Sequence, residues 1–267
     1  MHDFKYARAK TLADAAAAMK AASDGRFLAG GQTLIPVLKQ RLAQPSDLVD
    51  LAGIADLAGI TATPQSISIG AMTRHADVAA SPDVRRLLPA LAELAGGIGD
   101  PHVRNRGTIG GSLANNDPAA DYPAAVLGLG ATVTTDRRTI AADAFFNGLF
   151  TTALADGEII TSILFPVPDR AGYMKFPHPA SRYCLVGVMA SKGAQGVRVA
   201  VTGAGQSGVF RATAFEAALA KSFTAAAIDG IALPTGNMLS DLQAGAEYRA
   251  HLVGVMARRA IAKAGSA

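Results

Sequence analysis

The spacing of apolar and polar residues predicts helices and strands along most of the chain. Leu34, Val37, Leu38 and Leu42 recur at the three- and four-residue intervals of an amphipathic helix. Residues 66–71 (SISIGA) alternate polar and apolar side chains, as a strand with one buried face does. The same reasoning predicts further helices at residues 11–25, 84–97, 213–221 and 246–263. It predicts further strands at residues 26–29, 128–135, 159–165, 173–176, 184–191 and 197–201.

Polar residues at the expected helix starts support these assignments. Thr11 can cap the first helix, and Asp14 favours its positive end. With Thr33 as N-cap, Pro36 falls at the third helical position, where the backbone N–H has no partner inside the helix. The run from Thr213 to Glu216 has the form of a capping box.

The order of these elements predicts an α+β fold. Helices and strands alternate early in the chain, whereas strands are followed by helices late, which favours α+β units over one doubly wound sheet. The composition shifts around Pro166-Val167-Pro168, and we place a domain boundary there. No repeat with a period of 20–50 residues is present.

Composition favours a subunit that covers part of its surface with partners. Of the 267 residues, 17% are charged, which is below the roughly 25% of ordinary soluble domains. The net charge of +4 is spread over isolated arginine pairs, so no nucleic-acid-binding patch is expected. The N-terminus resembles no signal peptide and no uncharged apolar run is long enough for a membrane span, so we expect a cytoplasmic chain.

The cysteine and histidine content limits the chemistry of the chain. Cys184 is the only cysteine and is expected in the core, so the chain can hold neither an intrachain disulfide nor a cluster with four thiolate ligands. The five histidines are scattered without ligand spacing, and no metal site is expected. Of these, His102 lies just before a glycine pair and either touches a ligand or is solvated. Arg104 and Arg106, two apart in a strand-like stretch, either bind a phosphate or pair with acids.

Two glycine pairs carry the clearest chemical signal. Gly30-Gly31 joins a strand to a helix, and Gly110-Gly111 follows the strand-like Thr108-Ile109. Glycine tolerates positive φ and has no Cβ to keep a ligand away from the backbone N–H groups, which a pyrophosphate requires. Thr33 and Ser112 add hydroxyl donors next to the two pairs. Each pair alone could be a tight turn, but together they favour a phosphate cradle.

The residues after the second glycine pair leave alternatives open. Asp121 is either the N-cap of a following helix or an acceptor for ribityl or ribose hydroxyls; Asp117 is a second candidate cap. Asn115 and Asn116 are either polar ligands or turn residues.

A third glycine motif suggests a different cofactor. Gly203, Gly205 and Gly208 match the GxGxxG fingerprint of NAD-binding proteins and follow a predicted strand. The fingerprint requires its helix to begin at the glycines, whereas the next helix is expected only at Thr213. We therefore favour a glycine-rich bend, with NAD binding as an alternative.

Four segments resemble the FAD-binding medium subunit of the molybdenum hydroxylases, of the aerobic carbon monoxide dehydrogenase and xanthine dehydrogenase type. They are AGGQTLIPVLKQRL (29–42), IGDPHVRNRGTIGGSLANNDPAADYPAA (98–125), ASRYCLVGVMA (180–190) and AEYRAHLVGVMARRAI (246–261). The resemblance covers nearly the whole chain. Compared with the family, Thr33 stands where serine is commoner, and Asn115-Asn116 replaces a frequent His-Ala.

The resemblance implies an architecture and a set of FAD contacts. It implies a vanillyl-alcohol-oxidase-type FAD-binding domain at 1–166, with α+β subdomains at roughly 1–57 and 58–166, and a C-terminal domain at 167–267 with a small sheet and a helical bundle. The pyrophosphate cradle would comprise Ala29, Gly30, Gly31, Gln32, Thr33, Leu34, Thr108, Ile109, Gly110, Gly111 and Ser112. Asp121 would contact the cofactor, and Ile160 and Lys175 would lie near the flavin ring.

The resemblance also implies partner subunits. A large subunit would carry the molybdenum cofactor and a small one two [2Fe–2S] clusters, in a dimer of heterotrimers. The FAD of this chain would receive electrons from the clusters and pass them to an external acceptor, so no catalytic residue is assigned and the chain is not expected to act on substrate alone. The remaining alternatives are a self-contained flavin oxidase and a nucleotide-binding or scaffold protein.

Overall fold

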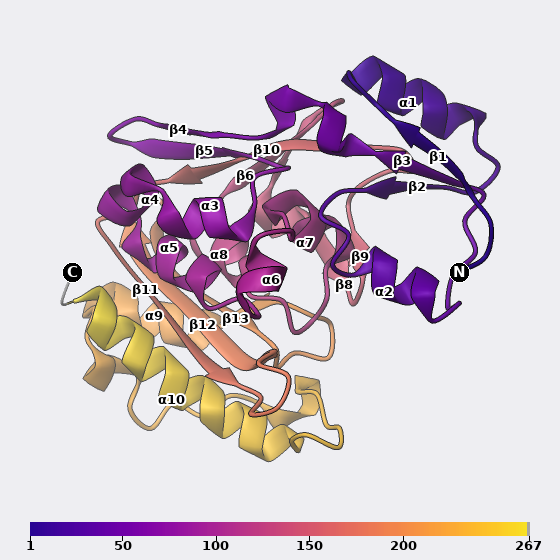
Figure 1. The fold of residues 1–267 in the computed structure, drawn as a ribbon. Coiled ribbons are helices and arrows are strands. Elements are labelled where there is room, and N and C mark those ends of the chain that lie inside the picture. Colours follow the sequence, from indigo (N-terminus) through magenta and orange to yellow (C-terminus); the bar gives the residue numbers. More distant parts are fainter. Residues whose placement is uncertain (266–267) are drawn as a thin grey trace.

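The computed structural model describes residues 1–265, which form three sheets, one short hairpin and the helices around them (Figure 1). The first sheet is parallel, in the order β1-β3-β2, and consists of β1 (Lys5–Arg8), β2 (Gly25–Leu28) and β3 (Asp47–Asp50). Helix α1 (Leu12–Ala21) connects β1 to β2, and α2 (Leu34–Lys39) lies between β2 and β3. Thr11 caps α1 as predicted, and Asp14 completes a capping box that the sequence analysis did not predict: Thr11 Oγ1 accepts from the Asp14 N–H, and Asp14 Oδ2 accepts from the Thr11 N–H.

The second sheet is antiparallel, in the order β4-β5-β10-β6-β7. Its strands are β4 (Ile60–Ala62), β5 (Ser66–Gly70), β6 (Thr132–Thr135), β7 (Thr139–Ala141) and β10 (Ile160–Pro166). Between β5 and β6 the chain forms α3 (His75–Ala80), α4 (Pro82–Leu87), α5 (Pro89–Gly96), α6 (Pro101–Arg104), α7 (Ile109–Asn115) and α8 (Tyr122–Gly128). The hairpin of β8 (Phe146–Gly148) and β9 (Thr151–Thr152) precedes β10.

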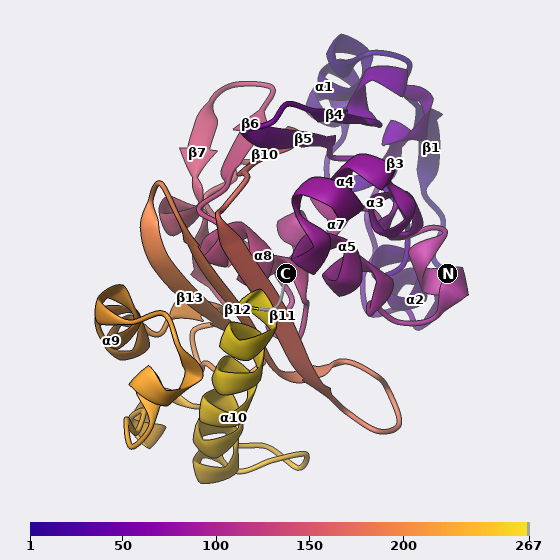
Figure 2. The same ribbon diagram turned by 90° about the vertical axis from the view of Figure 1, so that its left-hand side faces the viewer.

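The third sheet is antiparallel and lies between two layers of helices. It consists of β11 (Arg170–Pro177), β12 (Cys184–Gly193), β13 (Gly196–Thr202) and β14 (Phe210–Arg211), followed by α9 (Thr213–Lys221) and α10 (Ala246–Ala264). Helix α10 covers one face (Figure 2), and α8 packs against β12 and β13. Met189 accordingly belongs to the core shared with the second sheet, whereas its neighbour Val188 belongs to the core under α10. Both faces are buried, which explains the continuous apolar run of β12.

Short 3-10 turns complete the described chain at Leu51–Gly53, Ala55–Leu57, Ala142–Ala144, Ala225–Ile228 and Thr235–Asn237. The α+β class is confirmed. Domain boundaries near residues 57 and 166 stay a proposal, which the separation of the chain into three sheets supports.

Several local predictions need correction. The helix expected at 84–97 is interrupted at Leu88, because Pro89 disfavours helical geometry in the residue before it. The strand expected from residue 128 begins only at Thr132, because residues up to Gly128 end α8. Helix α9 begins at Thr213 as predicted, but without the capping box: Glu216 accepts from the Val199 N–H and pairs with Arg211.

Candidate cofactor-binding site

The first glycine segment presents unused backbone donors. It follows β2 directly, and Gly31 has a φ of +77°, a conformation that favours glycine. The N–H groups of Gly31, Gln32 and Thr33 find no acceptor among residues 1–265. Thr33 is the N-cap of α2 as predicted, but its side chain makes no capping hydrogen bond. The segment therefore offers adjacent donors to an anion.

The second glycine segment is helical, and this corrects the expected strand-to-turn geometry. Thr108 is the N-cap of α7, and its Oγ1 accepts from the Gly111 N–H at 3.2 Å. The Gly110 N–H donates to Ala71 O at 2.8 Å, so neither glycine presents a free donor. A Cβ on Gly110 would lie 2.6 Å from the Ala71 Cβ. Close packing, rather than positive φ, therefore requires glycine here.

The two segments meet backbone to backbone. A Cβ on Gly30 would lie 2.1 Å from Arg106 O and 2.8 Å from the Gly107 Cα. A Cβ on Gly111 would lie 3.5 Å from the Ala29 Cβ. The structure thus brings together the two predicted segments, of which one follows β2 of the first sheet and the other begins α7, between β5 and β6 of the second sheet.

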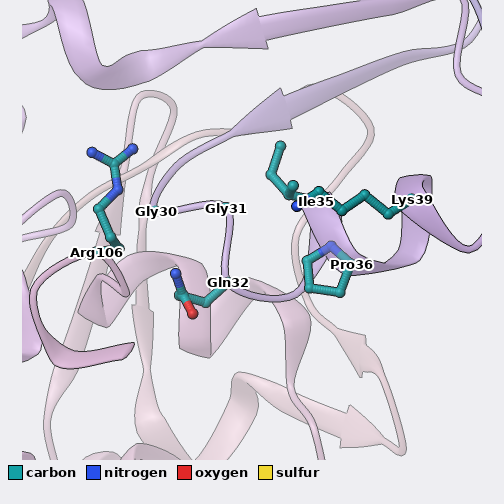
Figure 3. Close-up of a pocket in the computed structure, with 7 residues that line it drawn as sticks. All are labelled: Gly30, Gly31, Gln32, Ile35, Pro36, Lys39 and Arg106. Atoms are coloured by element: carbon teal, nitrogen blue, oxygen red, sulfur yellow. The ribbon is translucent and has the colours of Figure 1, made fainter. Parts of the chain in front are cut away.

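A cavity of about 310 Å³ opens at this junction. It is lined by Gly30, Gly31, Gln32, Ile35, Pro36, Lys39 and Arg106 (Figure 3). Arg106 stands beside Gly30 at one end and Lys39 lies at the other, with residues 30–32 between them. Neither Arg106 nor Lys39 forms an ion pair or side-chain hydrogen bond with a described residue, so both charges are available to an anionic ligand.

Sequence reasoning identified only part of this lining. Lys39 was missed, although its spacing of four from Ile35 places both on one face of α2. Arg104 and Arg106 do not share a strand face as expected: Arg104 ends α6 and donates to Ile98 O and Gly99 O, whereas Arg106 lies in the following loop.

Asp121 forms a buried polar contact with the third sheet. Its Oδ2 accepts from Lys175 Nζ at 3.0 Å, and its Oδ1 accepts from Tyr173 Oη at 2.5 Å. Asp121 occupies the N-cap position of α8, as one of the two alternatives proposed, but its side chain makes no capping hydrogen bond. Burial raises the pKa of this carboxyl group, while the charge of Lys175 and the Tyr173 hydroxyl act in the opposite direction.

Comparison with known proteins identifies the family. The model of the FAD binding domain in molybdopterin dehydrogenase matches residues 2–168. The chain belongs to this family.

Full-length relatives are medium subunits of oxidoreductases. The carbon monoxide dehydrogenase medium chain of Hydrogenophaga pseudoflava is 34% identical over 97% of this chain and 96% of the relative. The nicotine 6-hydroxylase medium subunit of Paenarthrobacter nicotinovorans is 34% identical over 98% of this chain and 97% of the relative. The resemblance to molybdenum hydroxylase medium subunits is thus confirmed, and the chain is an oxidoreductase subunit.

Solved structures share the whole fold. Quinoline 2-oxidoreductase from Pseudomonas putida 86 matches with a TM-score of 0.88 and 29% identity, over 99% of this chain and 97% of that one. Carbon monoxide dehydrogenase from H. pseudoflava, in a form lacking the Mo-pyranopterin moiety of the molybdenum cofactor, matches with a TM-score of 0.85 and 34% identity over 98% of this chain and 97% of that one.

The residues of this medium subunit fit a bound FAD at the first segment. The cavity is surrounded by N–H groups and two cations that have no partner among residues 1–265, and by a glycine whose Cβ would displace the neighbouring loop. At the second segment, the Ser112 hydroxyl has no hydrogen-bond partner among the described residues.

Two other predicted ligands have structural positions that suggest different roles. Ile160 is the first residue of β10, is 6% exposed and belongs to the second sheet's core, so its place near a flavin stays a prediction. Asn116 is buried with a φ of +43°, and its Nδ2 donates to Gly148 O and Thr151 O at 2.8 and 2.9 Å. Of the two alternatives for Asn116, a polar ligand or a turn residue, these contacts support the turn residue.

His102 is exposed on α6, which agrees with the solvated alternative for this side chain.

The glycine motif at 203–208 forms the predicted bend. Gly203 and Gly208 have φ values of +81° and +90°, and the motif joins the antiparallel strands β13 and β14. The parallel strand–helix–strand unit of a dinucleotide fingerprint is therefore not formed here. Among residues 1–265, no group of three potential metal ligands occurs, and no helix is long and apolar enough to cross a membrane.

Proposed function

We propose that this medium subunit carries FAD and transfers electrons within a heteromeric molybdenum hydroxylase. It receives them from [2Fe–2S] clusters of a small partner subunit and passes them to an external acceptor. The observation that carries the proposal is the cavity at the junction of the two glycine segments, with its unused N–H donors and unpaired cations, in a chain of the FAD-binding family. Bound FAD would supply the exchange between single-electron donors and a two-electron acceptor.

The chain's own residues bind and orient the cofactor in this proposal. Gly31, Gln32 and Thr33 donate N–H groups to the pyrophosphate, and Arg106 and Lys39 neutralise its charge. Ala29, Leu34 and the segment from Thr108 to Ser112 do not line the cavity itself and would contact the cofactor beside it. Asp121, Lys175 and Ile160 would lie towards the flavin end.

The proposal includes a partner assembly. A large molybdenum-cofactor subunit, a small iron–sulfur subunit and this chain would form a dimer of heterotrimers in the cytoplasm. The low share of charged residues, 17%, supports a chain with much covered surface. The relatives' names include carbon monoxide, nicotine and quinoline although their medium chains are similar, which supports substrate selection by another subunit.

Arg106→Ala tests the binding site. Its side chain is exposed and makes no bond with a described residue, so the fold should persist while FAD affinity falls roughly tenfold, the equivalent of about 1.4 kcal/mol. The matched control is Arg86→Ala on α4, which removes only an exposed pair with Asp83. FAD affinity is measured by flavin titration of the assembled complex, and equal affinity in both variants would contradict the proposed site.

The electron-transfer role is tested by flavin reduction. In the co-expressed complex, substrate should bleach the flavin absorption bands; in the isolated, FAD-loaded chain it should not. Reduction in the isolated chain would instead indicate a self-contained oxidase.

A further inference from the structure

A buried contact joins β11 to the start of α8 and involves none of the residues that line the cavity. Tyr173 and Lys175 are two residues apart on β11, so both side chains project from the same face of the strand. They bind the two oxygens of one carboxylate, that of Asp121. Asp121 and Tyr173 are 5% and 6% exposed, and the Lys175 side chain is 11% exposed.

The main chain around Asp121 is fixed independently of this contact. Gly203 N–H donates to Pro118 O at 2.9 Å, and Thr202 Oγ1 donates to Ala120 O at 2.7 Å. These bonds hold residues 118–120 on the third sheet whatever occupies position 173. The Tyr173 hydroxyl therefore acts mainly on the carboxylate. Its other polar neighbour is Cys184 Sγ, at 3.9 Å.

Lys175 has one donor left for a ligand. Of its three N–H groups, one is directed to Asp121 and one to Gly97 O at 3.2 Å. The third has no acceptor among the described residues, and the side chain retains some exposure. The position of this ammonium group depends on the carboxylate that Tyr173 holds.

We propose that Tyr173 is a positioning residue whose hydroxyl orients Asp121 and, through the Asp121–Lys175 pair, sets the charge next to the flavin. The inference rests on the proposed function, in which Lys175 lies near the flavin ring. A carboxylate without the Tyr173 donor is protonated more readily, which leaves the Lys175 charge uncompensated. An uncompensated positive charge favours reduced flavin, because the reduced form carries more electron density.

The test compares Tyr173→Phe with Tyr122→Phe in the assembled, FAD-loaded complex. Tyr122 is the chain neighbour of Asp121 and is fully buried, but its hydroxyl has no hydrogen-bond partner among the described residues. The midpoint potential of the flavin is measured by spectroelectrochemical titration. We expect a shift to a more positive potential in Tyr173→Phe and wild-type behaviour in Tyr122→Phe.

Every outcome of the potential measurement either supports or overturns the role of Tyr173. An unchanged potential in Tyr173→Phe with flavin bound overturns the inference, and so does loss of flavin from a folded Tyr173→Phe complex. If Tyr173→Phe does not fold, Asp121→Asn replaces it: a positive shift again supports the inference and no shift overturns it. Failure of the proposed function is distinguishable, because wild type and Tyr122→Phe would then lack flavin as well.

Discussion

At the scale of single residues, glycines and buried polar groups determine the site. Gly30 allows two loops to touch, and Gly110 allows a helix to begin against Ala71. Both glycine pairs could be located from the sequence, because adjacent glycines are visible without knowledge of the fold. The sequence analysis attributed the second pair to a turn, whereas glycine is required there by packing against Ala71, which is too distant in sequence to be recognised as a neighbour.

Gly30→Ala should separate the two loops. The new Cβ would meet a backbone carbonyl, which cannot move as a flexible side chain can, so we expect a loss of about 1–3 kcal/mol in the free energy of unfolding together with loss of FAD binding. Gly236→Ala is the control, because a Cβ there meets nothing within 4 Å. Denaturant unfolding and flavin content measure the two effects; equal stability of both variants would refute the steric argument.

His75 should make stability depend on pH. Burial, aided by the charge of Arg104, lowers its pKa from 6.5 to about 4. Below pH 6.5 this histidine is protonated in the unfolded chain, whereas in the folded chain it stays neutral down to about pH 4. Its contribution to the free energy of unfolding is therefore fully present above pH 6.5 and is lost progressively as the pH falls towards 4. The full effect is roughly 3 kcal/mol, from about 1.4 kcal/mol per pKa unit.

The measurement is the free energy of unfolding at several pH values between 4 and 7, a range set by the pKa of His75. His75→Gln should flatten the curve, whereas His251→Gln, at an exposed position, should keep the wild-type slope. A wild-type slope in His75→Gln would contradict a neutral buried imidazole.

At the scale of elements, predictions succeeded where burial imposes a pattern. The alternating SISIGA segment is a strand with Ile67 and Ile69 fully buried. Strand β1 is exposed along its length and has no such pattern, so nothing in its sequence revealed its parallel pairing with β3. The Asp121–Lys175 contact spans 54 positions, and only the family resemblance singled out both residues.

The hairpin of β8 and β9 depends on one asparagine. Asn116→Ala would leave two carbonyls without their donor and place alanine at positive φ, so we expect a loss of about 2–4 kcal/mol in unfolding free energy. Asn115→Ala is the matched control, because the Asn115 side chain makes no hydrogen bond with a described residue. Thermal unfolding compares them, and similar melting temperatures would count against this role.

At the scale of the whole molecule, buried polar side chains join the third sheet to α8 and to the turn that follows β7. Arg198 is 6% exposed, and it donates to Leu127 O and to both oxygens of Asp143, each at 2.8 Å. Ser191 Oγ donates to Gly128 O at 2.7 Å beside it. Sequence inspection did not predict this contact, because no local pattern indicates which arginine will be buried.

Arg198→Met should weaken the attachment of the C-terminal sheet. A buried carbonyl and an aspartate lose their donor, which costs about 1–3 kcal/mol of unfolding free energy. Arg86→Met, which removes an exposed ion pair, should change stability by less than about 0.5 kcal/mol. Chemical denaturation measures both, and the expectation fails if the two variants unfold at the same midpoint.

The meeting of Gly30 with Arg106 has a consequence for biosynthesis. One wall of the cavity follows β2 of the first sheet, and the other, at Arg106, lies in the chain between β5 and β6 of the second sheet. Neither unit alone offers a complete site, so the cofactor cannot serve as a template for early folding. Loading must follow the docking of both units, and by mass action each bound FAD then contributes its binding energy to keeping them docked. A cell short of flavin would accordingly accumulate apoprotein whose two units separate more readily and are exposed to proteolysis.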